Sequence, residues 1–269
     1  MKNHNTSLHT VLTAGLLITL TTVVGAQDQQ RVSDLTGGAP KGPSRIEIGA
    51  AFAQTLGASS FSSTQTVREY AEDGTLTSSY KVGKAPGAGF HVQYNLNKKF
   101  GIRVGGQTFS RKSDGTFSGK SPHPFFFNQQ RSYSGTQNGL GFNESAFTLT
   151  AVLRGASGKW NFALDGGPAY FNVNATIAER ATYTDTYPYD SVVFSSVATS
   201  KHKVNPIGLA MGVELGRELS DAVSVVVQGR YTGAKGSVEI NGQRVDVKAG
   251  GVQARIGLRL IAARARVKS

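Results

Sequence analysis

Apolar and polar side chains alternate with a period of two residues in eight segments of the chain, the first of which begins at Arg45. In the last segment, Val252, Ile256 and Leu258 share one face of an extended strand, while Gln and Arg side chains occupy the other face. This period is typical of a strand, because a helix would repeat every 3.6 residues. The pattern therefore predicts eight β-strands, at residues 45–52, 90–96, 102–108, 147–154, 160–170, 208–215, 224–231 and 252–260.

The connections between these segments alternate between short turns and long polar stretches. The short turns are 97–99, 155–159 and 218–222, and the longer connections are 55–86, 110–144, 174–205 and 232–249. Strands of about ten residues can cross a bilayer when tilted, and outer-membrane barrels have short periplasmic turns and long external loops. The sequence therefore predicts an all-β fold over residues 44–261, an eight-stranded antiparallel up-and-down transmembrane β-barrel with short periplasmic turns and long extracellular loops.

Two of the longer connections contain hairpin signals of their own. Asn241-Gly242 is a favoured pair for a two-residue type I′ turn, and strand-like residues flank it on both sides. We therefore expect the last two strands to continue beyond the membrane. Asp73-Gly74 gives the first long connection a similar but weaker signal.

On this prediction the mostly polar face of each strand lines the lumen, and the apolar face meets lipid. The interior of an eight-stranded barrel is just wide enough for side chains. We therefore expect a closed ion-pair network inside; the alternative is a selectivity ring or gate. The expected lumen network is Glu47, Arg103, Arg154, Asp165, Glu214, Arg230, Arg255 and Arg259. The expected lipid-facing side chains are Leu149, Leu164, Met211, Val213, Val225, Val227, Ile256 and Leu258.

The last three segments carry a more detailed pattern, which is Gly208-Leu209-Ala210-Met211-Gly212-Val213-Glu214, Gln228-Gly229-Arg230-Tyr231 and Gly250-Gly251-Val252-Gln253-Ala254-Arg255-Ile256-Gly257-Leu258. With these residues the chain resembles the small outer-membrane β-barrel domain family, over Arg45 to Leu260. The resemblance rests on alternation and glycine placement and includes no catalytic motif. It implies an eight-stranded barrel that the barrel assembly machinery inserts into a Gram-negative outer membrane, among lipid and lipopolysaccharide. The chain departs from the family after its last strand, where a basic tail follows instead of a terminal aromatic residue.

The first 26 residues have the order of a secretory signal peptide. Lys2 precedes an apolar run at 11–20, and Val24-Gly25-Ala26 places small residues before Gln27. The apolar run is too short to cross about 30 Å of hydrocarbon as a helix. We predict a cleaved signal peptide at 1–26, a periplasmic linker at 27–43 and a basic C-terminal tail at 262–269.

The composition narrows the function classes. The chain contains no cysteine, which excludes a disulfide framework, a thiolate metal site and the lipid-modified cysteine of a lipoprotein. Its formal net charge is +12, from 29 Lys and Arg against 17 Asp and Glu. These basic residues are scattered singly, without a basic helix, so the charge favours an anionic membrane surface as partner and not a nucleic acid.

Histidine limits any catalytic or metal-binding interpretation. After the signal peptide the histidines are His91, His123 and His202, and neither a Gly-x-Ser-x-Gly elbow nor a His-based metal spacing surrounds them. We therefore predict that the protein is not an enzyme and that it has no cofactor and no metal.

The most unusual local feature is the run Phe125-Phe126-Phe127 in the second long connection. These aromatics either dock a partner or enter lipid, or else they fold over the barrel mouth or extend a strand at the rim, and the sequence leaves both possibilities open. We predict an integral outer-membrane protein with a structural or surface-interaction role carried by its extracellular loops. Two alternatives remain, a passive small-solute channel and a soluble periplasmic β-barrel that binds a hydrophobic ligand inside. The second would require the opposite assignment of faces.

Overall fold

The computed structural model describes residues 44–57 and 59–264. The predicted signal peptide and linker lie outside the described residues, as do the last five residues of the predicted tail. Within the described part, no helix is long and apolar enough to cross a membrane. The described residues form eleven β-strands.

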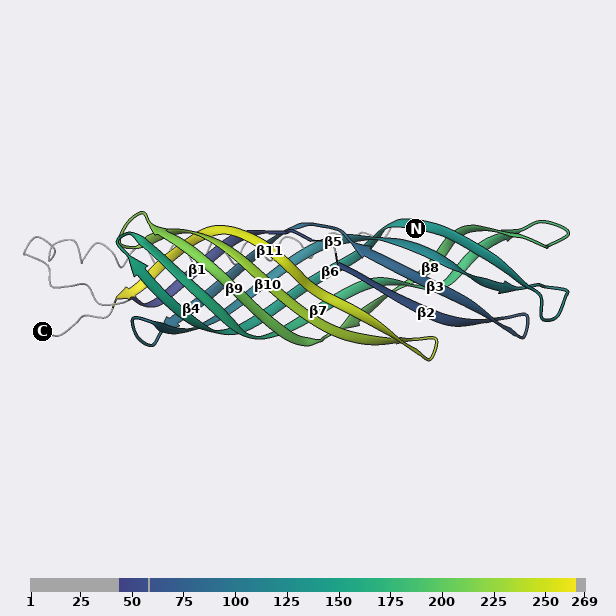
Figure 1. Ribbon diagram of the computed structural model, residues 1–269, viewed down its shortest axis with the longest axis horizontal. Coiled ribbons are helices and arrows are strands. Elements are labelled where there is room, and N and C mark those ends of the chain that lie inside the picture. Colours follow the sequence, from purple (N-terminus) through teal and green to yellow (C-terminus); the bar gives the residue numbers. More distant parts are fainter. Residues whose placement is uncertain (1–43, 58, 265–269) are drawn as a thin grey trace, which may run out of the picture.

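Eight of these strands close into an antiparallel ring in the order β5-β4-β1-β11-β10-β9-β7-β6, and β6 pairs with β5 to complete it (Figure 1). The predicted eight-stranded antiparallel barrel is therefore confirmed. The ring strands are β1 (Ser44–Thr55), β4 (Pro86–Asn95), β5 (Phe100–Pro122), β6 (Gln130–Ser157), β7 (Trp160–Asp185), β9 (Ile207–Glu218), β10 (Val223–Ile240) and β11 (Gln243–Arg264).

Side chains in the ring have the reverse polarity of a soluble protein. On β11, Arg255 and Arg259 are buried in the ring, whereas Ile256 and Leu258 are more than half exposed on its outer face. Soluble proteins bury apolar side chains and leave arginine exposed. The period-two alternation therefore produces a polar interior and an apolar outer surface.

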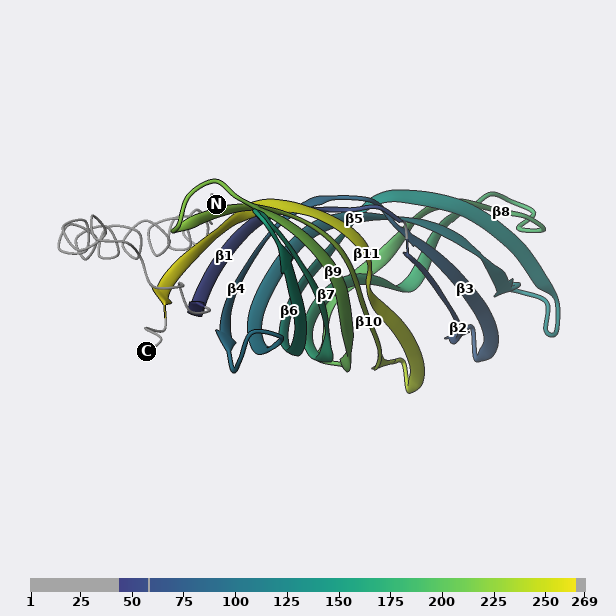
Figure 2. The same ribbon diagram turned by 60° about the vertical axis from the view of Figure 1, so that its left-hand side comes forward.

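The long connections predicted as loops are instead built largely of strands. Three further strands form there, β2 (Ser59–Glu69), β3 (Glu72–Val82) and β8 (Val192–Val204). The end of the barrel that lies away from the short turns is called the upper end. β2 and β3 pair as a hairpin that joins the upper part of β5, and β8 pairs with the upper part of β7. Together with the extended β5–β6 and β10–β11 hairpins they form an external β domain at the end opposite the short turns (Figures 1 and 2).

A separate apolar core holds the external β domain together. Phe61 stacks on Tyr80 with ring centroids 4.7 Å apart, and Tyr80 meets Phe117 edge-on at 5.9 Å. The Tyr80 hydroxyl accepts a hydrogen bond of 2.8 Å from the backbone N–H of Ala178, and Gln65 donates to the carbonyl of the same residue at 3.2 Å. Ala178 lies at a register shift of β7. Tyr80 and Gln65 therefore provide hydrogen-bond partners for its backbone N–H and carbonyl.

One of the two predicted hairpin turns is correct and the other is wrong. Asn241 and Gly242 both have positive φ and join paired strands, as predicted. In the first hairpin the turn lies at Tyr70 and Ala71, with φ of 49° and 64°, and Gly74 falls inside β3. A turn at Gly74 would draw residues of β4 into the hairpin. The glycine instead permits close packing, because a Cβ there would lie 2.5 Å from the Lys120 carbonyl oxygen.

Candidate functional site

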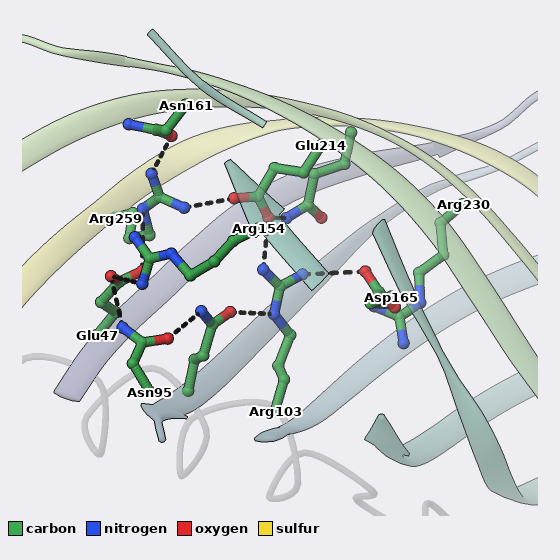
Figure 3. A network of polar contacts seen from close by, with 11 residues as sticks. Glu47, Asn95, Arg103, Arg154, Asn161, Asp165, Glu214, Arg230 and Arg259 are labelled. Atoms are coloured by element: carbon green, nitrogen blue, oxygen red, sulfur yellow. Dashed lines mark hydrogen bonds and ion pairs between the residues drawn. The ribbon is translucent and has the colours of Figure 1, made fainter. Parts of the chain in front are cut away.

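The lumen network centres on Arg103 of β5, which is 1% exposed. Its guanidinium donates to Asp165 at 3.1 Å and to Glu214 at 2.8 Å, and its Nε donates to Gln93 at 2.9 Å (Figure 3). The two carboxylates belong to β7 and β9, which do not neighbour β5 in the ring. Arg103 therefore crosses the lumen and ties separate parts of the wall together.

A second group of contacts lies toward the short turns. Arg259 is 2.5 Å from Glu214 and 3.4 Å from Glu47, so it joins β11 to β9 and β1. Glu47 also accepts from Arg154 at 2.7 Å and from Asn95 at 2.8 Å (Figure 3). These contacts extend the network around Arg103 to the lower rim.

The upper part of the lumen is bound less tightly. Arg230 lies 3.6 Å from Asp165, which it shares with Arg103, and donates to the Thr148 hydroxyl at 3.1 Å. Arg255 makes no ion pair with a described carboxylate; its guanidinium donates to Gln253 at 2.7 Å and to Gln107. The structure thus brings seven of the eight predicted residues into one network and places Arg255 beside it, on neutral partners.

The predicted charge network left out several members of the interior. The neutral side chains Gln93, Asn95 and Gln228 occupy inward positions of the same alternation, and each donates a hydrogen bond within the network. Arg111 and Glu144, 3.6 Å apart, form a further buried pair. They lie in the connection 110–144, which was predicted as a loop. The alternation of buried and exposed side chains continues through both residues, and this alternation would have indicated that the two strands extend further.

The predicted lipid-facing side chains all lie on the outer face of the ring. Seven of the eight are between 52% and 56% exposed, and Val225 is half-buried. Aromatic side chains lie near both ends of this apolar band. Phe90, Phe147 and Tyr170 form a row that follows cross-strand pairing at the upper end, and Trp160 lies next to a short turn at the lower end.

The three phenylalanines project from the tip of the β5–β6 hairpin. Phe125, Phe126 and Phe127 are 72%, 58% and 77% exposed, so they do not fold over the barrel mouth. His123 shapes this turn, since its Nδ1 accepts hydrogen bonds of 3.1 Å from the backbone N–H groups of Phe125 and Phe126. Tyr189 packs on Phe125 with ring centroids 5.4 Å apart. The tip is therefore an ordered, exposed aromatic surface.

A polar cluster below the tip locks three hairpins together. Glu69 of β2 accepts from Tyr183 of β7 and, at 2.8 Å, from Arg180. Ser121 of β5 lies 2.6 Å from the Tyr183 hydroxyl. Burial, followed by the hydrogen bond to Glu69, raises the pKa of Tyr183. Burial and the charge of Glu69 raise the pKa of Tyr133 to about 12.

One group of side chains contains the residue types of a hydrolase triad but lacks its geometry. Ser200 Oγ lies 2.5 Å from His202 Nε2, and Glu179 lies 3.4 Å from the same nitrogen and also accepts from Ser200. In a catalytic triad the carboxylate holds the opposite ring nitrogen and thereby orients the base. The described residues contain no group of three or more His, Asp or Glu side chains suited to a metal ion.

Comparison with known proteins gives matches of structure only. No family model matches the chain, and no curated protein matches it. The outer-membrane protein OprG from Pseudomonas aeruginosa superposes with a TM-score of 0.53 at 13% identity, over 82% of this chain and 96% of OprG. The chain has the fold of a small outer-membrane β-barrel. Neisserial surface protein A (NspA) matches at a TM-score of 0.42 and 10% identity, over 80% of this chain and 96% of its own.

Proposed function

We propose that this chain is an integral outer-membrane protein whose closed barrel anchors an external β domain with a surface-interaction role. The observation that carries the proposal is the reversed polarity of the ring. Arginines such as Arg103 are buried inside, while side chains such as Leu149 and Met211 stand half exposed outside. In water such an outer surface would be a large apolar patch, whereas a bilayer is its natural solvent. The fold shared with OprG agrees with this location.

The surroundings of the barrel follow from this location. Outer-membrane lipid would cover the apolar band, with the aromatic side chains at its two interfaces. Exposed lysines stand a few residues above the upper aromatic row, among them Lys112, Lys203, Lys235 and Lys248. Lipopolysaccharide phosphates would neutralise them. Export by a cleaved signal peptide and insertion by the barrel assembly machinery belong to the same proposal.

The aromatic tip supports the interaction role. From Phe109 to Pro122, β5 continues for roughly 40 Å of strand at about 3.3 Å per residue, so the tip is held well away from the apolar band. Exposed phenylalanines on an ordered turn leave apolar surface in water, and such patches mark sites of contact with a partner. The polar cluster around Glu69 keeps the tip in place before a partner arrives.

Neither catalysis nor conduction belongs to this proposal. The Ser200 group lacks the geometry of a triad, and the network around Arg103 occupies the lumen that a solute would have to cross. A soluble barrel with a hydrophobic ligand would need an apolar interior, which is the opposite of the arrangement around Glu47 and Arg259.

The membrane location is tested by fractionation. We expect the protein in the detergent-soluble outer-membrane fraction, with gel mobility that changes on heating, and recovery in the soluble periplasmic fraction would refute the proposal.

The interaction role is tested by adhesion of cells that display the protein. Replacing Phe125, Phe126 and Phe127 together by Ser should lower adhesion, and the matched control replaces Gln129 and Gln130 by Ser. Equal adhesion of all three strains, at equal surface amounts, would refute the role of the tip.

A further inference from the structure

The described interior of the barrel holds more buried positive charge than negative charge. Six arginines point into the lumen or its upper mouth, but only four carboxylates do so. The arginines are Arg103, Arg111, Arg154, Arg230, Arg255 and Arg259, and the carboxylates are Glu47, Glu144, Asp165 and Glu214. Two positive charges are therefore not matched by acids of the described residues.

The excess is concentrated in the upper lumen. Arg255 is 6% exposed and bonds only to the amide oxygens of Gln253 and Gln107. Its charge is repelled by Arg230 and Arg103 and attracted by Asp165, which already serves both of those arginines. Amide oxygens satisfy hydrogen bonds of a guanidinium without cancelling its charge.

An arginine does not relieve this situation by losing its proton, because a guanidinium stays protonated in proteins. A buried charge without a counter-charge costs several kcal/mol even after the protein relaxes. The interior of a narrow barrel is also poorly screened by bulk salt. A counter-ion bound inside the lumen would offset this cost directly.

Arg255 lies near a buried histidine that has an unused ring nitrogen. Arg255 reaches across from β11 over Gly89 of β4, where a Cβ would lie 3.2 Å from its Nη1. His91, two residues along β4, is 6% exposed, and its Nε2 has no hydrogen-bond partner among the described residues. Gly105 of β5 pairs with His91, and a Cβ at Gly105 would lie 3.3 Å from the Cβ of His91 and from the Oγ1 of Thr148. The two glycines therefore let Arg255, His91 and Thr148 approach one another, and the Nε2 of His91 stays without a hydrogen-bond partner among the described residues.

Arg230 completes the site from the opposite wall. It extends from β10 to Thr148 of β6, and its Nε has no partner among the described residues. Four positive charges act on His91, first Arg103 and Arg259 and then Arg230 and Arg255. Donors from β4, β10 and β11 thus lie in one region of the upper lumen.

We propose that Arg255, Arg230 and His91 bind a small inorganic anion, such as chloride, in the upper lumen. The ion accepts hydrogen bonds from the two guanidinium groups and from the Nε2–H of His91. It is monatomic or of similar size, because an eight-stranded barrel has little space beyond its own side chains. The ion is a structural counter-charge and is bound when the barrel closes.

The direct test uses bromide as the probe. The protein is crystallised from a bromide salt, and anomalous diffraction is measured at the bromine edge. We expect a peak in contact with the guanidinium groups of Arg255 and Arg230. The absence of a peak there in a well-ordered lumen, or water alone at that place, would overturn the proposal.

A solution test uses folding from urea into lipid vesicles at constant ionic strength, with chloride replacing gluconate. A site that binds only the folded state raises the folded-to-unfolded ratio about 11-fold when the anion is at ten times its Kd. Arg255→Gln should abolish this chloride dependence. The control Arg244→Gln changes a residue of the same strand whose side chain is 78% exposed, and it should leave the dependence unchanged.

Two results of the solution test would contradict the proposal. One is equal folding of the unmodified protein in chloride and in gluconate. The other is a chloride dependence that Arg255→Gln leaves intact. If Arg255→Gln does not fold, the bromide experiment on the unmodified protein decides alone.

Discussion

Val227 on the outer face of β10 provides a quantitative test of what surrounds the barrel. Val227 is 52% exposed and lies four residues from Val223 at the lower end of the strand and four from Tyr231 near the upper aromatic row. It also pairs with Ile256 and Leu215, which both face outward. Val227 is therefore close to the middle of the apolar band.

Val227→Arg should destabilise the folded protein by about 2 to 4 kcal/mol, because an arginine at the bilayer midplane of a barrel costs that amount. Since about 1.4 kcal/mol is a factor of ten, the folded-to-unfolded ratio should decrease by a factor of roughly 30 to 700. The matched control is Val193→Arg, the same substitution at an outward position of β8 in the external β domain, where the valine is 68% exposed. An exposed surface change of this kind usually alters stability by less than about 0.5 kcal/mol.

The assay is urea titration into lipid vesicles, followed by the heat-dependent gel mobility of the folded form. If Val227→Arg and Val193→Arg lose the same stability, lipid does not cover the band. Cysteine labelling separates the two faces independently. A lipid-soluble reagent should label a cysteine at position 227 and not one at 228, where Gln228 is 5% exposed and bonded to Glu214.

Three further predictions concern the interior and the external domain. Glu214→Gln leaves Arg103 and Arg259 short of a buried counter-charge and should cost about 3 to 5 kcal/mol in the same titration, while Asp246→Asn in an exposed pair should change little. In planar bilayers the protein should carry little or no steady current, because side chains cross the lumen, and stable openings of porin size would contradict this. Tyr133 binds its proton more tightly when folded, since its pKa rises from 10 to about 12. The raised pKa of Tyr133 therefore adds to the free energy of unfolding below pH 10, and this contribution is lost as the pH rises to about 12. Tyr133→Phe should flatten the alkaline part of the plot of stability against pH. An unchanged plot would contradict the assignment of this pH dependence to Tyr133.

The alternation of the sequence was sufficient to predict the ring and the direction of its side chains. Arg103, Glu214 and Val213 fall on the faces that their positions predict, because the pleat of a strand is local geometry and needs no knowledge of neighbours. The short turns likewise predicted which strands pair in sequence. The external β domain was harder to predict, since many of its outward positions are Ser, Thr or Gly and its inward aromatics are spaced widely.

Tertiary structure alone decided which side chains meet. Arg103 pairs with carboxylates 62 and 111 residues away, and these partners depend on the tilt and closure of the ring. Arg255 and Arg259 both occupy inward positions of β11 in the alternation. Closure of the ring nevertheless gives Arg259 a carboxylate partner, whereas Arg255 bonds to the side-chain amide of Gln253. It also sets the first external turn at Tyr70, because β4 must begin where it can pair with β1. Strand direction is a property of adjacent residues, whereas ion pairing across a lumen is a property of the closed ring, and no period in the sequence encodes it.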